Sequence, residues 1–393
     1  MEEQKKLLIM LPNIDFAGAE LLACYQARNL SAKYRVTILV LGRVVNQEVL
    51  GDKVESGKLN IIELNTGIEV LDKNSLQSLF FNINKIKKAI RNISPDLIIA
   101  HLPISHLVSK LINLLSKDKF KIVCYHHGML VDGSNQSYFA KFKNSLLLHL
   151  NTILIGSSQI QHIFISLAVK DDVVRYEKLA RENGVIVYNT IPFSDLGDQQ
   201  VGTNSDIEKA SIKIVIPGRL QWEKGTLFFL DVLKAFKDNP LYGQCYFKFC
   251  GGGPLHNQAM DLICANGLSE NVSITGALGH VDILNEINNA DIVVIPSLVE
   301  GLSIVALESL YLSKVVLSSD AGGLPEVIQD KINGYLFAHG DIPSCVEALI
   351  AVLTLYRENN TISGSAIKDS YERKFSGTNH LAKLELVIDS MLC

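Results

Sequence analysis

The sequence contains no run of about 18 unbroken apolar residues, the length that a membrane-spanning helix needs. Near its start, the apolar run Leu7–Leu11 is interrupted by Pro12, and it is too short for the hydrophobic region of a secretory signal. The seven cysteines are scattered, odd in number and lack a C-x-x-C pair, so neither a disulfide framework nor a zinc site is expected. These absences predict a cytoplasmic protein with reduced thiols.

The chain also lacks the basic excess of a nucleic-acid-binding protein. Its formal net charge is −4, and no RNP, zinc-finger or helix-turn-helix pattern is present. The charge is uneven, because residues 1–195 hold 23 Lys and Arg against 18 Asp and Glu, whereas the remainder holds 14 against 23. In the basic half, Leu79–Lys88 and Tyr138–Leu148 mix lysine with large apolar residues. This mixture suits a surface that rests on anionic lipid, although an ordinary amphipathic helix covering a sheet has the same pattern.

What the chain does contain is typical of a globular protein, with 48% apolar and 20% charged residues. Its 393 residues are too many for one ordinary core and predict two domains. Short β-branched runs, each followed by a helical pattern, recur along both halves. The predicted strands are Lys6–Leu11, Arg35–Leu41, Leu59–Leu64, Asp96–Ala100, Lys121–Tyr125, Thr152–Gly156, Gly184–Tyr188, Ile212–Ile216, Tyr246–Cys250, Val272–Thr275, Asp291–Ile295, Ser313–Ser318 and Gly334–Phe337.

Alternation of strands and helices predicts parallel, doubly wound α/β sheets, here two Rossmann-like domains facing across a deep cleft. Ser194–Asp206 is polar and without periodicity, which indicates a linker. We therefore expect a first domain over 1–195, a linker over 196–210 and a second domain over 211–374. The segment Tyr371–Cys393 has a helical pattern, and the C-terminal helix, about 375–393, is expected to pack back onto the first domain.

The most informative motif is Pro296–Glu308, which follows an apolar strand and passes through one glycine into a helical segment. Unpaired backbone N–H groups and the helix dipole make such a turn an anion site. Glu300 and Glu308 place a carboxylate on each side of it, roughly 8–12 Å apart. That span suits a nucleotide sugar, with the diphosphate in the middle, although a polar loop before an ordinary helix has the same spacing.

Three further glycine-containing turns follow predicted strands in the second half. Pro217–Gly225 holds Arg219 and Lys224, two cations able to neutralise a diphosphate. Cys250–Leu255 contains three glycines that allow backbone to approach a ring or ribose, and Ser319–Glu326 contains a glycine pair and a glutamate. Each is also compatible with a purely structural turn. Because open α/β sheets bind ligands at the carboxyl ends of their strands, these turns are candidates for one site.

In the first half, Pro12–Glu20 follows the first strand and contains Gly18, but it is not the G-x-G-x-x-G of dinucleotide binding. His126-His127-Gly128 follows another strand, where a neutral imidazole could donate to a hydroxyl or phosphate. His101 is a weaker candidate of the same kind, and a satisfied structural role is the alternative for each histidine.

Taken in order, these motifs resemble the family-4 retaining glycosyltransferases of the GT-B fold (glycosyl transferases group 1). The resemblance spans most of the chain and is strongest over residues 212–340. It rests on Gly18-Ala19-Glu20, Val187-Tyr188-Asn189, Gly218-Arg219-Leu220, Lys224-Gly225, Gly251–Pro254, Gly276, Ala290-Asp291, Pro296-Ser297, Glu300, Glu308 and Gly322–Glu326. Two departures affect the acceptor side: Ala17-Gly18 stands where a double glycine is commoner, and Thr190 stands where glycine is usual.

The resemblance implies a role for each motif. Arg219 and Lys224 correspond to the diphosphate clamp, Glu308 to the ribose ligand, and Glu300 to the ligand of the sugar hydroxyls. The remaining implied site residues are His127 near the transferred sugar, Gly18 in the loop that closes on donor or acceptor, and Gly252, Gly253, Gly301, Leu302 and Ser303 along the donor. No essential metal and no cofactor are implied, in agreement with the missing D-x-D at a strand end.

The expected function is transfer of a sugar, with retention, from a nucleotide-diphosphate sugar, most simply a UDP-sugar, to a glycan acceptor. The basic, apolar first half favours a lipid-linked acceptor at the inner membrane face, as in the assembly of lipopolysaccharide, O-antigen or capsule. Two alternatives share the fold: a nucleotide-sugar epimerase or hydrolase, which would act on donor alone, and a non-catalytic partner subunit, which would bind no nucleotide.

Overall fold

The computed structural model describes residues 4–14, 18–45, 59–68, 73–116, 119–129, 159–177, 184–192 and 211–393. The described residues form two compact units. Unit 1 comprises the described residues from 4 to 192 together with Gly377–Cys393, and unit 2 comprises residues 211–376. The predicted linker, the predicted strand Thr152–Gly156 and the basic stretch Tyr138–Leu148 lie outside the described residues.

Unit 1 is built on a parallel seven-stranded sheet in the order β3-β2-β1-β4-β5-β6-β7. Leu7–Leu11 of its first strand are completely buried, as expected for a parallel strand covered by helices on both faces. The strands are β1 (Lys6–Leu11), β2 (Arg35–Val40), β3 (Leu59–Glu63), β4 (Leu97–His101), β5 (Lys121–His126), β6 (Ile160–Phe164) and β7 (Val185–Ile186). Strand β6 was not among the predicted strands.

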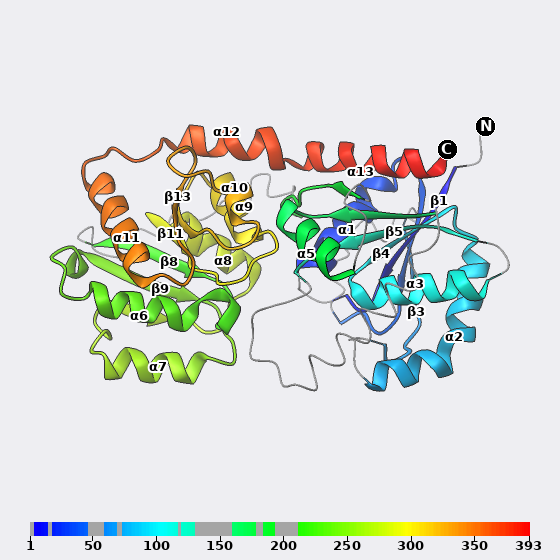
Figure 1. Cartoon of the computed structure of the whole chain (residues 1–393), viewed down its shortest axis with the longest axis horizontal. Helices are drawn as coiled ribbons and strands as arrows, with labels where there is room; N and C mark the ends of the chain where they lie inside the picture. Colours follow the sequence, from blue (N-terminus) through cyan, green and yellow to red (C-terminus); the bar gives the residue numbers. More distant parts are fainter. Residues whose placement is uncertain are drawn as a thin grey trace. The chain divides into compact units, whose positions relative to one another are not determined.

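The helices of unit 1 cover the two faces of this sheet (Figure 1). They are α1 (Gly18–Leu30), α2 (Lys73–Ile93), α3 (Pro103–Leu115), α5 (Leu167–Glu177) and α13 (Gly377–Leu392). Helices α2 and α3 enclose one apolar core with β1, β2, β4 and β5. On the other face α13 contacts α1 and the turn that follows it, because His380 contacts Gln26 at 3.0 Å and Asp389 accepts hydrogen bonds from Lys33 and Tyr34 at 2.8 and 2.6 Å.

Unit 2 contains a parallel six-stranded sheet in the order β10-β9-β8-β11-β12-β13. Its strands are β8 (Ile212–Pro217), β9 (Cys245–Cys250), β10 (Val272–Ile274), β11 (Ile292–Ile295), β12 (Val315–Ser319) and β13 (Tyr335–Phe337). Its helices are α6 (Thr226–Phe236), α7 (His256–Ala265), α8 (His280–Asn288), α9 (Ile304–Tyr311), α10 (Leu324–Val327), α11 (Ile342–Arg357) and α12 (Gly364–Phe375), with single 3₁₀ turns η3 (Trp222–Lys224) and η4 (Tyr242–Gln244). Both sheets are doubly wound, which confirms the predicted fold class of two Rossmann-like units.

The C-terminal segment Tyr371–Cys393, for which a helical pattern was predicted, is helical except at Ser376 and Cys393. The chain forms α12 and α13, with Ser376 between them in an extended conformation. Gly377 starts α13 close to Tyr25, because a Cβ on it would lie 2.3 Å from the Tyr25 hydroxyl oxygen. The close approach of α13 to α1 therefore favours glycine where the second helix begins.

Candidate functional site

The candidate donor site lies where the strand order of unit 2 reverses. Strand β8 has β9 on one side and β11 on the other, and in doubly wound sheets the crevice at such a switch point binds ligands. Arg219 and Lys224 follow the carboxyl end of β8, and Glu300 follows that of β11. The topology thus brings these predicted residues to one edge of the sheet.

Lys224 and Glu300 are in direct contact at this edge. The Lys224 Nζ donates to Glu300 Oε2 at 2.7 Å, and the Ser297 hydroxyl donates to the same oxygen at 3.3 Å. The side chain of Glu300 is 10% exposed and that of Lys224 is 34% exposed, so the carboxylate is the buried partner. The lysine expected in the diphosphate clamp and the glutamate expected at the sugar hydroxyls are therefore one ion pair.

Backbone contacts hold the two loops together around this pair. The Leu298 amide donates to the Glu223 carbonyl at 2.8 Å. Gly225 has φ +68°, and a Cβ there would lie 1.9 Å from the Pro296 carbonyl oxygen. Only glycine accommodates this approach. The close packing at Gly225 positions the neighbouring Lys224 next to the loop that follows β11.

A second glycine attaches the loop after β12. Gly322 has φ +54°, and a Cβ on it would lie 1.9 Å from the Glu300 carbonyl oxygen. The Gly323 amide donates to that carbonyl at 3.0 Å. The loop after β12 therefore packs directly against the backbone of Glu300.

The segment Gly301–Ser303 leads directly into α9. Ser303 is the N-cap, and its hydroxyl accepts from the Ala306 amide at 3.3 Å. Leu302 and Ser303 are buried, whereas Gly301 is partly exposed. The first turn of α9 therefore presents amide N–H groups and the positive end of the helix dipole beside the Lys224–Glu300 pair, an arrangement that favours an anion.

Glu308, one turn into α9, has a partner of its own. Its Oε1 contacts His280 Nε2 at 2.7 Å, and its side chain is 2% exposed against 28% for the imidazole. His280 is the first residue of α8 and was not predicted as a site residue. The only available signal was its position just after β10, at the same carboxyl edge as the predicted residues. Each of the two glutamates is therefore oriented by a different basic side chain.

Arg219 is exposed, and no described residue makes a hydrogen bond or ion pair with its guanidinium. The glycines after β9 support its loop: the Leu220 amide donates to the Gly252 carbonyl at 2.9 Å, and a Cβ on Gly253 would lie 2.3 Å from the Leu220 carbonyl oxygen. The observed role of Gly252 and Gly253 is thus to pack against the Arg219 loop. This contact leaves the guanidinium available to an anion.

Gly18 and His127, the two predicted site residues of the first half, belong to unit 1. Gly18 is the first residue of α1, and His127 follows β5. The His127 ring stacks on Tyr125, and its Nε2 contacts His101 Nδ1 at 2.8 Å. Among the described residues, His127 Nδ1 has no hydrogen-bond partner. Burial lowers the pKa of His127 to about 3, so a neutral imidazole with one unused nitrogen stands at the end of this strand.

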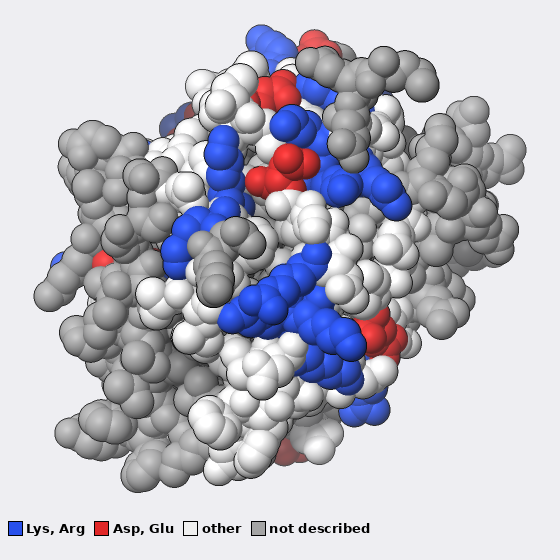
Figure 2. Space-filling view, turned by 90° about the vertical axis from the view of Figure 1, so that its right-hand side faces the viewer, with Lys and Arg blue, Asp and Glu red and all other residues white. Residues whose placement is uncertain are grey.

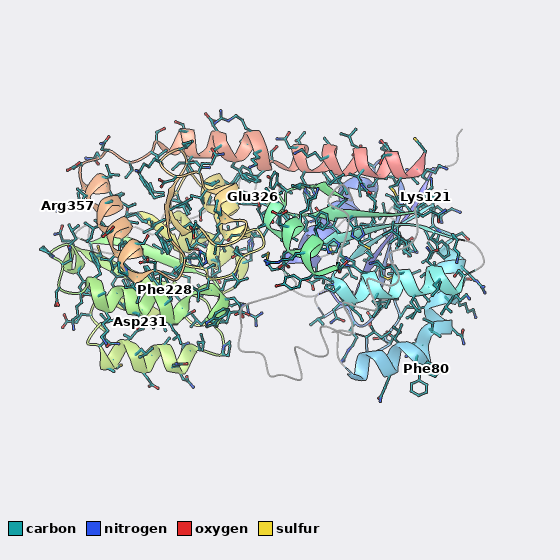
Figure 3. All side chains as sticks on the ribbon, viewed as in Figure 1. Phe80, Lys121, Phe228, Asp231, Glu326 and Arg357 are labelled. Atoms are coloured by element: carbon teal, nitrogen blue, oxygen red, sulfur yellow. The ribbon has the colours of Figure 1, made fainter. Side chains whose placement is uncertain are left out.

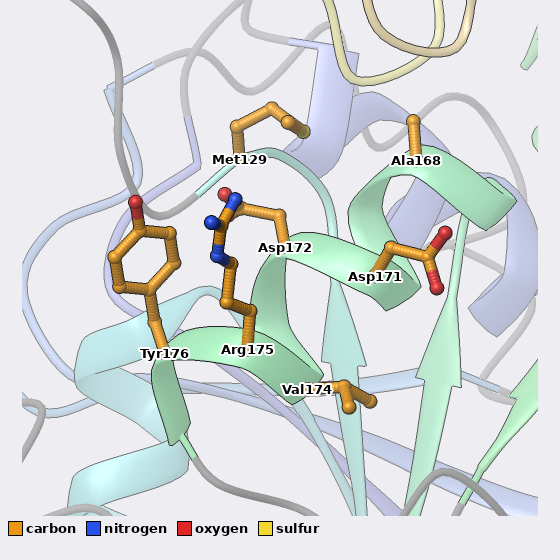
Figure 4. Close-up of a pocket in the computed structure, with 7 residues that line it drawn as sticks. All are labelled: Met129, Ala168, Asp171, Asp172, Val174, Arg175 and Tyr176. Carbon is orange, nitrogen blue, oxygen red and sulfur yellow. The ribbon is translucent and has the colours of Figure 1, made fainter.

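A pocket of about 570 Å³ is lined by Met129, which follows His127 closely in the sequence, and by residues of α5 (Figure 4). Its walls combine two carboxylates, a guanidinium, a phenol ring and three apolar side chains. The lining residues are Met129, Ala168, Asp171, Asp172, Val174, Arg175 and Tyr176. In Figure 4 Arg175 extends between Tyr176 and Asp172. Hydroxyl acceptors, a cation and an aromatic face together suit a saccharide.

Among the residues that the structure describes, no three His, Cys, Asp or Glu side chains are grouped as metal ligands. Within the same residues, no helix has both the length and the apolar character to cross a bilayer.

Comparison with known proteins assigns each half of the chain to a family. Residues 16–194 match the model of Glycosyltransferase Family 4, and residues 203–369 match that of Glycosyl transferases group 1. The chain belongs to the family-4 glycosyltransferases. The first match covers most of unit 1 and the second most of unit 2, so both Rossmann-like units of this chain fall within family models.

Two curated relatives match shorter stretches. The alpha-D-kanosaminyltransferase of Streptomyces kanamyceticus is 29% identical over 36% of this chain and 36% of its own length. The UDP-Gal:alpha-D-GlcNAc-diphosphoundecaprenol alpha-1,3-galactosyltransferase of Escherichia coli is 26% identical over 43% of each chain. The matched part of this chain thus spans less than half the length of either relative.

Among solved structures, Anabaena HepE in complex with UDP and glucose superposes with a TM-score of 0.75. The alignment covers 98% of this chain and 100% of HepE, at 17% identity. At that identity the likeness establishes the fold, and it confirms the GT-B architecture expected from the motifs.

Proposed function

We propose that this protein is a metal-independent, retaining glycosyltransferase that transfers a hexose from a nucleotide-diphosphate sugar, most simply a UDP-sugar, to a hydroxyl of a glycan acceptor. The observation that carries the proposal is the Lys224–Glu300 ion pair beside the α9 N-terminus, at the switch point of the unit 2 sheet. HepE, with the same fold, was solved with UDP and glucose, and the E. coli relative is named for a UDP-galactose donor.

The ion pair suggests how the donor would be held. A diphosphate beside the α9 N-terminus would accept hydrogen bonds from the amides of the first turn of α9 and from the remaining N–H groups of Lys224. The exposed guanidinium of Arg219 would bind the diphosphate from the solvent side. Glu300 would keep Lys224 oriented and accept a hydrogen bond from a sugar hydroxyl. Glu308, held by His280, is positioned one helical turn further for the ribose hydroxyls. Gly252 and Gly253 would act indirectly, through the Arg219 loop.

Catalysis in this proposal consists of stabilising the departing diphosphate and orienting the two substrates. As the glycosidic C–O bond to phosphate breaks, negative charge grows on the phosphate oxygens that face Lys224 and Arg219. The acceptor hydroxyl attacks from the same face and transfers its proton to the leaving oxygen, which gives retention without a covalent intermediate. His127 is assigned to a hydroxyl of the transferred sugar through its unused Nδ1, and Gly18 to the loop that closes on donor or acceptor.

We place the acceptor in unit 1. The pocket of Figure 4 offers a carbohydrate ring the face of Tyr176 and the hydroxyl-accepting carboxylates of Asp171 and Asp172. We further propose that the acceptor is lipid-linked, in surface-polysaccharide assembly at the inner membrane face, because the E. coli relative is named for a diphosphoundecaprenol acceptor. Tyr176→Ala should then raise the KM for the acceptor with little change in donor affinity.

The decisive experiment titrates UDP-sugars into the full chain and follows Trp222, the single tryptophan, which shares the turn η3 with Lys224. We expect saturable binding, and we expect Arg219→Ala with Lys224→Ala to lower the transfer rate by roughly 10²–10³. Lys234→Ala, at an exposed lysine of α6, is the control. Near-normal turnover of the double variant would reject the clamp. Absence of nucleotide binding would reject the enzyme, and sugar isomers formed from donor alone would indicate an epimerase.

A further inference from the structure

Helix α2 of unit 1 combines exposed aromatic rings with positive charge. Its sequence over Lys73–Ile93 contains four lysines and one arginine and no acidic residue. Phe80 and Phe81 are 78% and 81% exposed, their rings meet edge to face at 5.9 Å, and Phe80 projects away from the helix at the margin of the unit (Figure 3). Large aromatic side chains are mostly buried in folded proteins, so two adjacent exposed rings on a helix require an explanation.

The exposed rings are not the core face of the helix. Leu79, Ile86 and Ile90 are the side chains that α2 contributes to the buried core. Lys88 and Arg91 are exposed, and at eight and eleven positions after Phe80 they fall on the same side of an α-helix as that ring. Helix α2 therefore has an apolar face that covers the sheet and a separate outer face that is both aromatic and basic.

The end of α3 extends this outer face. Leu114 and Leu115 are 60% and 49% exposed. Lys87 of α2 donates to the Leu115 carbonyl at 2.5 Å, and Lys119 donates to the carbonyls of Asn113, Leu114 and Ser116 at 2.9, 3.2 and 3.2 Å. The ammonium groups of Lys87 and Lys119 thus lie beside two exposed leucines. The side of unit 1 seen in Figure 2 has Lys and Arg spread across its middle, with few Asp or Glu among them.

We propose that the outer face of α2 and the end of α3 form a docking surface for an anionic lipid bilayer. The lipid surface is defined by Phe80, Phe81, Lys88 and Arg91 of α2 with Leu114 and Leu115 of α3. The helix lies parallel to the bilayer, its two rings and two leucines enter the interface, and the cations meet the phosphates. Anionic lipid is the occupant that fits, because α2 has five basic residues and no acidic residue in the same helix as its two exposed rings.

The test is flotation of the full chain with two kinds of vesicle, phosphatidylcholine alone and an equal mixture of phosphatidylcholine and phosphatidylglycerol. We expect binding to the mixed vesicles that weakens as salt rises. Phe80→Ser with Phe81→Ser should lower the vesicle partition coefficient by at least about tenfold. Lys88→Glu with Arg91→Glu should lower it by a similar factor at low salt and by less at high salt.

The control variant is Ile332→Ser with Leu386→Ser, which removes two other side chains that are 62% and 70% exposed. Ile332 is in unit 2, and Leu386 is in α13, on the other side of the unit 1 sheet from α2. This control variant should bind vesicles as the wild type does. Circular dichroism melts check that each variant folds, and vesicle binding needs no donor, so it can fail or succeed whether or not the proposed transfer activity holds. Equal binding to both vesicles, no binding by the wild type, or an unchanged aromatic variant would each overturn the proposal.

Discussion

The Lys224–Glu300 contact predicts measurable coupling between the two residues in the absence of ligand. A hydrogen bond to a charged group contributes about 1.5–3 kcal/mol to stability. One third of the lysine side chain is exposed, so solvent screening brings the expected contribution down to about 1–2 kcal/mol. Lys224→Met should therefore lower the free energy of unfolding of unit 2 by about that amount, because it leaves the largely buried Glu300 carboxylate without its cation.

Fluorescence of Trp222 makes the measurement specific to unit 2, because the chain has one tryptophan and it lies in η3. Urea unfolding is followed for the wild type, Lys224→Met, Glu300→Gln and the double variant. For a unit of this size the expected loss corresponds to about 2–8 °C in Tm. The double variant should lose less than the sum of the two single losses, with a coupling energy of about 1–2 kcal/mol.

Lys248 and Glu286 supply a matched control in the same unit. Their contact is 2.6 Å, but both side chains are about equally exposed, at 31% and 27%. Their coupling energy should be smaller, below about 1 kcal/mol. Additive losses for Lys224 and Glu300, within about 0.3 kcal/mol, would refute the argument that burial of the carboxylate makes this pair strong.

Two further predictions concern backbone fit and pH. Gly322→Ala should destabilise unit 2 by several kcal/mol and weaken UDP binding, because its Cβ would meet the Glu300 carbonyl. The control is Gly243→Ala, which should change the stability little because nothing lies within 4 Å of a Cβ there. Equal Tm values for the two variants would contradict the prediction. Burial lowers the pKa of His127 and His162 to about 3 and of His380 to about 4, so the folded unit 1 binds fewer protons than the unfolded chain. Its stability is complete above the ordinary histidine pKa of about 6.5 and falls as the pH drops toward 3, by about 2 kcal/mol per histidine at pH 5. Circular dichroism melts between pH 7.5 and 5 check this, with Trp222 reporting unit 2 separately; a pH-independent melt of unit 1 would contradict it.

Most of the fold could be predicted because buried parallel strands leave a strong signal. Runs such as Lys6–Leu11 and Ile292–Ile295 are almost wholly apolar, and parallel strands covered on both faces must be so. Strand β6 was missed because it begins Ile-Gln-His and has little of that character. The close approach of Gly377 to the Tyr25 hydroxyl could not be predicted, because the two residues are hundreds of positions apart in the sequence.

The edge of the sheet on which the candidate site lies could also be predicted, because each motif follows a strand and parallel strands end at one edge. The side-chain partners could not. Lys224 and Glu300 are 76 positions apart, and His280 and Glu308 are 28 apart. For the first pair, the contact depends on how closely the loops pack at Gly225 and Gly322.

The path of the chain has a consequence for its biosynthesis. Unit 1 is built from residues on both sides of unit 2, and its last helix, α13, is translated only after the whole of unit 2. A ribosome that has released residues 4–192 has not yet supplied His380 or Asp389, so the contacts of α13 with Gln26, Lys33 and Tyr34 are missing while the second half is made. A fragment ending before Gly377 lacks those contacts permanently, and expression of unit 1 by itself would need α13 joined to it.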